Sequence, residues 1–221
     1  MENLSVTALG KEGVAKALEE TFDKRKQLRR TLTSHVATRF YRAPELILME
    51  KDYSKPVDIW SIGVIMGELL NSIEGNQPPE TQRKCLFPGK YCFPLSPNKQ
   101  SELDEEGIPD TRGDQLEVIF EMIGTPDALE TSFITDSKAL SYLERFKPQK
   151  AVDLKMLYPK SDPQGLDLIK QMLSFNPYFR PTVDECLKHP YFEEVTQFST
   201  AVNANGIVDM ELEYKNSLSL A

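Results

Sequence analysis

Histidine and cysteine are scarce in this sequence, and their scarcity excludes several kinds of site. The 221 residues include two histidines, His35 and His189, and three cysteines, Cys85, Cys92 and Cys186. An odd number of cysteines without a repeated spacing predicts neither a disulfide framework nor a zinc site. Two histidines also leave little for histidine-based nucleophilic catalysis. We therefore expect no metal site in this chain and a reducing, intracellular location.

Excess positive charge and long apolar runs are absent as well. The chain has 34 acidic and 26 basic residues, a formal net charge of −8 and a pI near 5.0. This balance argues against nucleic acid or an anionic membrane as the main partner. No uncharged apolar run approaches membrane-spanning length, and the first 30 residues lack a secretory-type apolar segment. Since 40% of the residues are hydrophobic, the chain can bury a core, and its length predicts one domain with long insertions.

The apolar spacing predicts a mainly α fold with almost no β pattern. The strongest helix is expected to begin near Pro56 and to continue to about Leu70, and it is apolar on nearly every face. Such a helix should be buried all round, which makes Asp58 in its first turn unusual, because a buried carboxylate needs hydrogen-bond donors. Further helices are expected near Ala43-Pro44 and over residues 114–123, 127–133, 137–146, 163–173 and 183–188.

Two regions show weak periodicity. Residues 1–30 are polar, with only Val14, Leu18 and Phe22 spaced four apart on one possible helix face. The basic residues among 24–30 indicate a solvated charged stretch, with attraction of a phosphate or an acidic partner as the other interpretation. Residues 71–113 are punctuated by six prolines and predict a long irregular insertion, partly disordered around a compact Leu-Phe-Pro-Gly at 86–89.

Several motifs occur in a fixed order along the chain. Residues 38–45 read TRFYRAPE, and 13 residues after Glu45 comes DIWSIG at 58–63. The later motifs are LFPG at 86–89, IGTP at 123–126, MLSFNP at 172–177 with Arg180, HPYF at 189–192 and DMEL at 209–212. Together they resemble the activation segment and large lobe of eukaryotic protein kinases, and more narrowly those of the MAP kinases in the CMGC group. Phe40 replaces the tryptophan of the family motif.

The resemblance implies the large, C-terminal lobe of the protein-kinase-like fold, with the small β lobe absent. Residues 1–42 would form an activation segment that includes the P+1 loop, which binds the residue after the phosphoacceptor. Residues 43–192 would form the helical lobe, with the long insertion at 71–113 and a MAP kinase-type insert at about 126–160. Residues 193–221 would be a C-terminal tail extension.

The resemblance also implies roles for single residues near the activation segment. Thr38, Arg39 and Arg42 would shape the P+1 loop, the pocket that accompanies a preference for proline after the acceptor. Ordinary surface cations are the other interpretation of the two arginines. MAP kinases carry Thr-x-Tyr just upstream, where this chain has Thr-Ser-His at 33–35. Thr33 is therefore the candidate activation-loop phosphosite, and His35 excludes dual phosphorylation of the usual kind.

A second set of residues would be structural. Glu45 would pair with Arg180 and tie the activation segment to the far end of the helical bundle. Asp58 would accept backbone N–H groups from the catalytic loop, and it would be under-satisfied where that loop is missing. Trp60 and Gly63 belong to the same central-helix motif, and Trp60 is expected in the core.

The chemistry-bearing motifs of a protein kinase do not occur in these 221 residues. There is no Gly-x-Gly-x-x-Gly, no Val-Ala-Ile-Lys, no His-Arg-Asp and no Asp-Phe-Gly. We therefore predict no catalytic residue, no metal ligand and no cofactor in this chain alone, and no phosphoryl transfer by it. The intact family enzyme would use ATP and magnesium to phosphorylate Ser/Thr-Pro protein substrates under an upstream kinase, in the cytoplasm or nucleus.

Three interpretations of such a chain remain. It is a truncated form of a functional MAP kinase-like enzyme, a stand-alone lobe that acts as a pseudokinase-type binding or docking module, or a helical scaffold with chance similarity. An isolated lobe would expose the apolar floor of its cleft, so a loose or aggregation-prone protein is expected. The sequence identifies no particular substrate, activator or oligomeric state.

Overall fold

The computed structural model describes residues 6–28, 38–76, 85–95 and 111–196. The chain divides into two units, Met1–Tyr191 and Phe192–Ala221, and the described part of the second is residues 192–196. The α-helices are α1 (Val6–Glu20), α2 (Phe22–Lys26), α3 (Pro44–Ile47), α4 (Pro56–Asn71), α5 (Gln115–Ile123), α6 (Ser137–Leu143), α7 (Leu154–Leu157), α8 (Pro163–Met172), α9 (Val183–Leu187) and α10 (Glu193–Thr196). Three 3₁₀ turns are η1 (Arg39–Tyr41), η2 (Pro177–Phe179) and η3 (Pro190–Phe192).

The predicted mainly α class is confirmed. The described residues form no extended strand and contain only isolated bridge positions, among them a parallel bridge between Tyr91 and Asp114. In the same ranges, no helix has both the length and the apolar character that crossing a bilayer requires.

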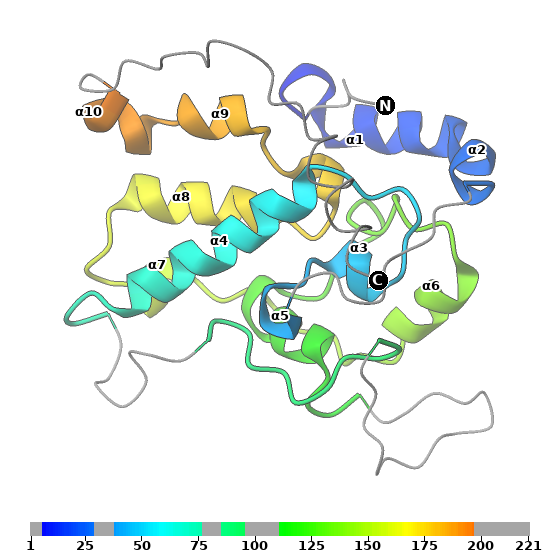
Figure 1. Cartoon of the computed structure of the whole chain (residues 1–221), viewed down its shortest axis with the longest axis horizontal. Helices are drawn as coiled ribbons and strands as arrows, with labels where there is room; N and C mark the ends of the chain where they lie inside the picture. Colours follow the sequence, from blue (N-terminus) through cyan, green and yellow to red (C-terminus); the bar gives the residue numbers. More distant parts are fainter. Residues whose placement is uncertain (1–5, 29–37, 77–84, 96–110, 197–221) are drawn as a thin grey trace, which may run out of the picture. The chain divides into compact units, whose positions relative to one another are not determined.

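Helices α4 and α8 pack side by side at the centre of the first unit (Figure 1). They run antiparallel, because Gly63 of α4 approaches Met172 while Gly67 approaches Ile169. A Cβ atom on Gly63 would lie 2.9 Å from the Cβ of Met172, closer than side-chain atoms normally come. Glycine at position 63 therefore sets how closely the two helices pack.

One face of α4 is uncovered, so the prediction that this helix is buried all round is wrong. Trp60 and Val64 are fully buried, whereas Ile62, Ile65 and Leu69 are 49%, 47% and 65% exposed. These three residues are spaced three and four apart, which places them in one row along the helix. We call this row of Ile62, Ile65 and Leu69 the uncovered stripe.

Part of the region predicted as an irregular insertion lies in the core. Leu86, Phe87 and Cys92 belong to the main hydrophobic cluster, and the Phe87 ring stacks on Trp60 with centroids 5.8 Å apart. The side-chain amide of Gln115 donates to the Phe87 carbonyl at 3.0 Å. The described residues 85–95 are thus fixed against both α4 and α5.

Asp114 holds this segment at the start of α5. One carboxylate oxygen accepts from the Leu116 amide at 2.9 Å, which caps the helix, and the other accepts from the Phe93 amide at 2.9 Å. The side chain is completely buried, and burial raises its pKa to about 6. The ionisation of this carboxyl therefore falls in the mildly acidic range of pH.

The predicted helix at 127–133 is wrong, because these residues form consecutive turns. The Asp127 side chain accepts from the Glu130 amide, while the Asn176 side chain reaches the Leu129 carbonyl at 3.2 Å. One helical hydrogen bond forms here, from the Thr131 amide to the Asp127 carbonyl at 3.0 Å, and the tighter bonds that follow it do not continue a helix. The other predicted helices form within a few residues of their expected limits, with the 137–146 helix ending early at Leu143.

Candidate functional site

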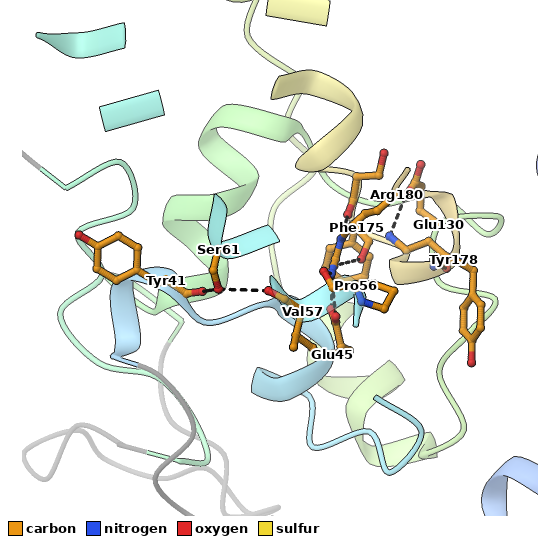
Figure 2. Close-up of polar contacts among 11 residues, drawn as sticks. Tyr41, Glu45, Pro56, Val57, Ser61, Glu130, Phe175, Tyr178 and Arg180 are labelled. Carbon is orange, nitrogen blue, oxygen red and sulfur yellow. Dashed lines mark hydrogen bonds and ion pairs between the residues drawn. The ribbon is translucent and has the colours of Figure 1, made fainter. Parts of the chain in front are cut away.

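Residues 38–42 form a short loop that rests on α4, and we call it the 38–42 loop. The Tyr41 amide donates to the Thr38 carbonyl at 3.0 Å, and the Arg42 amide donates to the Arg39 carbonyl at 3.2 Å. Figure 2 shows Ser61 of α4 beside Tyr41, and its hydroxyl donates to the Tyr41 carbonyl at 3.1 Å. The backbone of the loop is therefore fixed both internally and to the central helix.

Glu68, a second residue of α4, also fixes the position of the loop. Its Oε2 atom accepts from the Tyr41 hydroxyl at 3.0 Å, and its Oε1 atom accepts from the Leu86 amide at 3.3 Å. The hydrogen bond to this carboxylate raises the pKa of Tyr41, so the phenol stays protonated and remains a donor. One carboxylate of α4 thereby joins the loop to the segment that begins at residue 85.

The two arginines of the loop lie in different environments. The Arg39 guanidinium lies 5.2 Å from the centroid of the Phe40 ring, and the side chain is partly exposed. Arg42 is only 8% exposed, and its NH1 atom lies 3.4 Å from the Cys92 sulfur. The interpretation of Arg42 as an ordinary surface cation is therefore wrong. Thr38 is exposed beside them.

Cys92 is a neighbour of the loop that the sequence did not indicate. Its side chain is fully buried, and burial raises the pKa of the thiol to about 11, so it is neutral at pH 7. The neutral thiol accepts a hydrogen bond from Arg42 and is not poised as a nucleophile. No local signal pointed to this contact, because 50 residues separate the two side chains.

Glu45 and Arg180 form a buried, two-pronged ion pair directly after the loop. NH1 and NH2 of Arg180 donate to the two carboxylate oxygens of Glu45, each at 2.7 Å (Figure 2). The remaining N–H groups donate to the carbonyls of Pro56, Ser174 and Phe175 at 2.9, 2.9 and 3.1 Å. All five guanidinium donors thus have acceptors, which is the condition under which a buried charge is tolerated.

Two residues of the central-helix motif on α4, Trp60 and Asp58, lie in different environments. Trp60 is fully buried, with the Arg180 guanidinium 5.0 Å from its ring centroid. Asp58 is exposed at the N-terminal end of α4, and no side-chain hydrogen bond joins it to another residue that the structure describes. The expected burial of Asp58 is therefore wrong for this chain. Thr33 and His35 lie outside the described residues.

The arrangement presents a rigid polypeptide surface rather than a set of reacting groups. In the described ranges, no three His, Cys, Asp or Glu side chains gather as metal ligands would. No step of phosphoryl transfer is therefore assigned to the residues of the 38–42 loop. What they do provide is a short loop whose position is fixed by hydrogen bonds to Ser61 and Glu68.

Comparison with known proteins identifies the class of protein to which this fold and loop belong. The model of the protein kinase domain matches residues 13–192, so the chain belongs to the protein kinase family. Within that family it is MAP kinase-like.

The mitogen-activated protein kinase mpk-1 of Caenorhabditis elegans is 37% identical over 163 residues, which cover 74% of this chain and 30% of the relative. The mitogen-activated protein kinase mpkB of Aspergillus fumigatus is 36% identical over 162 residues, which cover 73% of this chain and 37% of the relative. A mitogen-activated protein kinase of Fusarium vanettenii has the same identity and coverage as mpkB. The chain spans about a third of the length of the curated relatives it matches.

Proposed function

We propose that this chain forms the substrate-facing, large-lobe part of a MAP kinase-like serine/threonine protein kinase. The uncovered stripe on α4 is the observation that carries the proposal. Three large apolar side chains in one row lie about half exposed, with the Asp58 carboxylate at the N-terminal end of the same helix. A helix that is apolar on every face is stable when every face is covered. The rest of a kinase domain would cover this face and supply the catalytic groups.

The proposed reaction is that of the family. The intact enzyme would transfer the γ-phosphoryl group of ATP, with magnesium, to a serine or threonine that is followed by proline. The 38–42 loop would bind the residue after the acceptor, with Thr38, Arg39 and Arg42 shaping the pocket. Thr33 would be the site at which an upstream kinase activates the enzyme. We place this reaction inside the cell, in the cytoplasm or the nucleus.

The division of the chain belongs to the same proposal. Residues 1–42 would be the activation segment, 43–192 the helical lobe and 193–221 the tail extension. Because His-Arg-Asp, Asp-Phe-Gly and the phosphate-binding motifs do not occur in residues 1–221, these residues alone would not transfer phosphate. Glu45 and Arg180 both lie within the proposed helical lobe, and their ion pair fixes its first residues, directly after the 38–42 loop, to its far end.

A phosphorylation assay tests the proposal. The 221-residue protein is incubated with magnesium, ATP and a Ser-Pro peptide, and a matched Ser-Ala peptide serves as the control. We expect no turnover from the chain alone, and phosphorylation of the Ser-Pro peptide by a longer product whose transcript encodes the catalytic motifs upstream. Turnover by the chain alone at the roughly 1–100 s⁻¹ of ordinary kinases would overturn the claim that the catalytic half is missing.

A stand-alone binding module is the second candidate. It is favoured by the complete hydrogen bonding of Arg180 and the full burial of Trp60, since both belong to a core that is closed within this chain. Calorimetric titration distinguishes the two: a module binds the Ser-Pro peptide more tightly than the Ser-Ala peptide without any partner. An in-frame stop codon just before Met1, with abundant protein of this size in cells, would also favour the module.

A further inference from the structure

Charged residues bound the uncovered stripe of α4 at both of its ends. Lys55 and Asp58 are exposed at the N-terminal end of the helix. Glu74 is exposed just after the C-terminal end, and the Lys160 side chain lies beside it, since its Cγ atom would be 3.2 Å from a Cβ atom on Gly75. This face of α4 is therefore apolar in the middle and carries one charge of each sign at either end.

The apolar row is long enough for another helix to pack along it. Ile62 and Leu69 are seven residues apart, which corresponds to about 10 Å, or two turns of α-helix. Ile73 follows the helix, is 39% exposed and prolongs the row. Steps of three, four and four residues, from 62 to 65, 69 and 73, are the spacing by which two helices pack along a common seam. The row thus has the form of one half of a helix–helix interface.

A second copy of the chain offers a surface that complements this face. A two-fold dimer uses the same patch on both subunits, so the patch has to be complementary to itself. If two α4 helices pack antiparallel, Lys55 comes to the end that carries Glu74 in the second copy, and Asp58 comes to the end that carries its Lys160. Parallel packing would instead place like charges together and align the two helix dipoles. The charges at the ends of the stripe therefore favour the antiparallel arrangement.

We propose that this chain forms a two-fold dimer in which the uncovered stripe of each copy packs antiparallel against that of the other. Ile65 then lies near the two-fold axis and meets its own equivalent, while Ile62 lies opposite Leu69 of the second copy. Each stripe is used once, so assembly stops at two copies. The inference uses the same exposed face as the proposed function, and the rest of a kinase domain would compete with the second copy for it.

Sedimentation velocity of the 221-residue protein at several concentrations tests the association. We expect a monomer that converts to a discrete dimer as the concentration rises. Ile65→Glu places two carboxylates together at the axis, and it should raise the dissociation constant of the dimer by about tenfold or more. Leu187→Glu is the matched control, because Leu187 of α9 is 56% exposed, close to the 47% of Ile65, and it should leave the dissociation constant unchanged.

Cross-linking with a short bis-maleimide tests the direction of packing. The experiment is done in a Cys85→Ser background, because Cys85 is partly exposed whereas Cys92 and Cys186 are buried. Ile62→Cys and Leu69→Cys are treated singly and as an equal mixture. Antiparallel packing brings position 62 to position 69 of the second copy, so the mixture should cross-link faster than either variant alone.

Every other outcome overturns the proposal. A monomer at all concentrations would mean that the stripe does not bind a second copy. Species that grow steadily beyond two copies would mean that the contact is not closed by a two-fold axis. An equal effect of Ile65→Glu and Leu187→Glu would place the contact elsewhere, and faster cross-linking of the single variants would make the packing parallel. None of these measurements involves phosphoryl transfer, so this proposal and the proposed function can fail separately.

Discussion

Replacement of Glu45 by glutamine is the most direct test of how the lobe is held together. The change keeps the size of the side chain and leaves the Arg180 guanidinium buried without its counter-charge. Both partners are almost fully buried and are joined by two hydrogen bonds of 2.7 Å. Removing one member of such a pair costs about 3–5 kcal/mol, which is roughly a 150- to 5,000-fold loss in the folding equilibrium. Because a domain of this kind is stable by about 5–15 kcal/mol, the loss is a large fraction of the total.

Urea unfolding measures this loss with a reporter that the chain already carries. Trp60 is the only tryptophan, it is fully buried, and the Arg180 guanidinium lies 5.0 Å from its ring centroid. With an m-value of about 2 kcal/mol/M, a loss of 3–5 kcal/mol lowers the midpoint by about 1.5–2.5 M urea. Glu121→Gln is the control, because Glu121 is exposed on α5 and should change stability by less than about 0.5 kcal/mol. A Glu45→Gln midpoint within 0.5 M of the unmodified protein, a shift of about 1 kcal/mol, would refute the reasoning.

Two further predictions concern pH and association. Burial raises the pKa of Asp114 to about 6 from an ordinary value of 3.8, so the native state binds more protons than the unfolded state between those values. The free energy of unfolding should therefore fall, relative to Asp114→Asn, by up to about 1.4 kcal/mol per pH unit as pH rises from 4 to 6, and urea titrations at several pH values measure this. A difference that is flat or rises with pH contradicts it. Leu69→Glu places a charge in the uncovered stripe and should reduce self-association of the purified chain, measured by sedimentation velocity. Met156→Glu, at an 80% exposed residue of α7, is the matched control and should reduce it less.

The longer helices could be predicted because local rules agree there. Helices α4 and α8 both begin with proline in the first turn, and both carry apolar residues at helical spacing. Their limits in the structure lie within a few residues of the predicted ones. The order of kinase motifs likewise located the 38–42 loop, since each motif is a local string of residues.

Properties that depend on distant contacts could not be predicted. Arg25 stands in a basic stretch, and only the fold shows that it reaches the Phe133 carbonyl, 108 residues away. The exposure of one face of α4 depends on what packs over it, which the apolar residues of the helix do not specify. The contact of Arg42 with Cys92 also joins residues that are 50 positions apart, so local sequence rules do not predict it. In each case tertiary structure overrides the local expectation.

Glu68 has a consequence for how this chain can vary through evolution. Its carboxylate accepts one hydrogen bond from the Tyr41 hydroxyl and one from the Leu86 amide. The hydrogen bond at residue 86 is made through the backbone, so it does not depend on the side chain there, whereas the hydrogen bond at residue 41 requires a phenol. Insertions between residues 76 and 85 can therefore lengthen or shorten without altering the loop, because a longer loop costs little closure entropy. A single carboxylate thus joins the 38–42 loop to the point where the chain returns from residues 77–84.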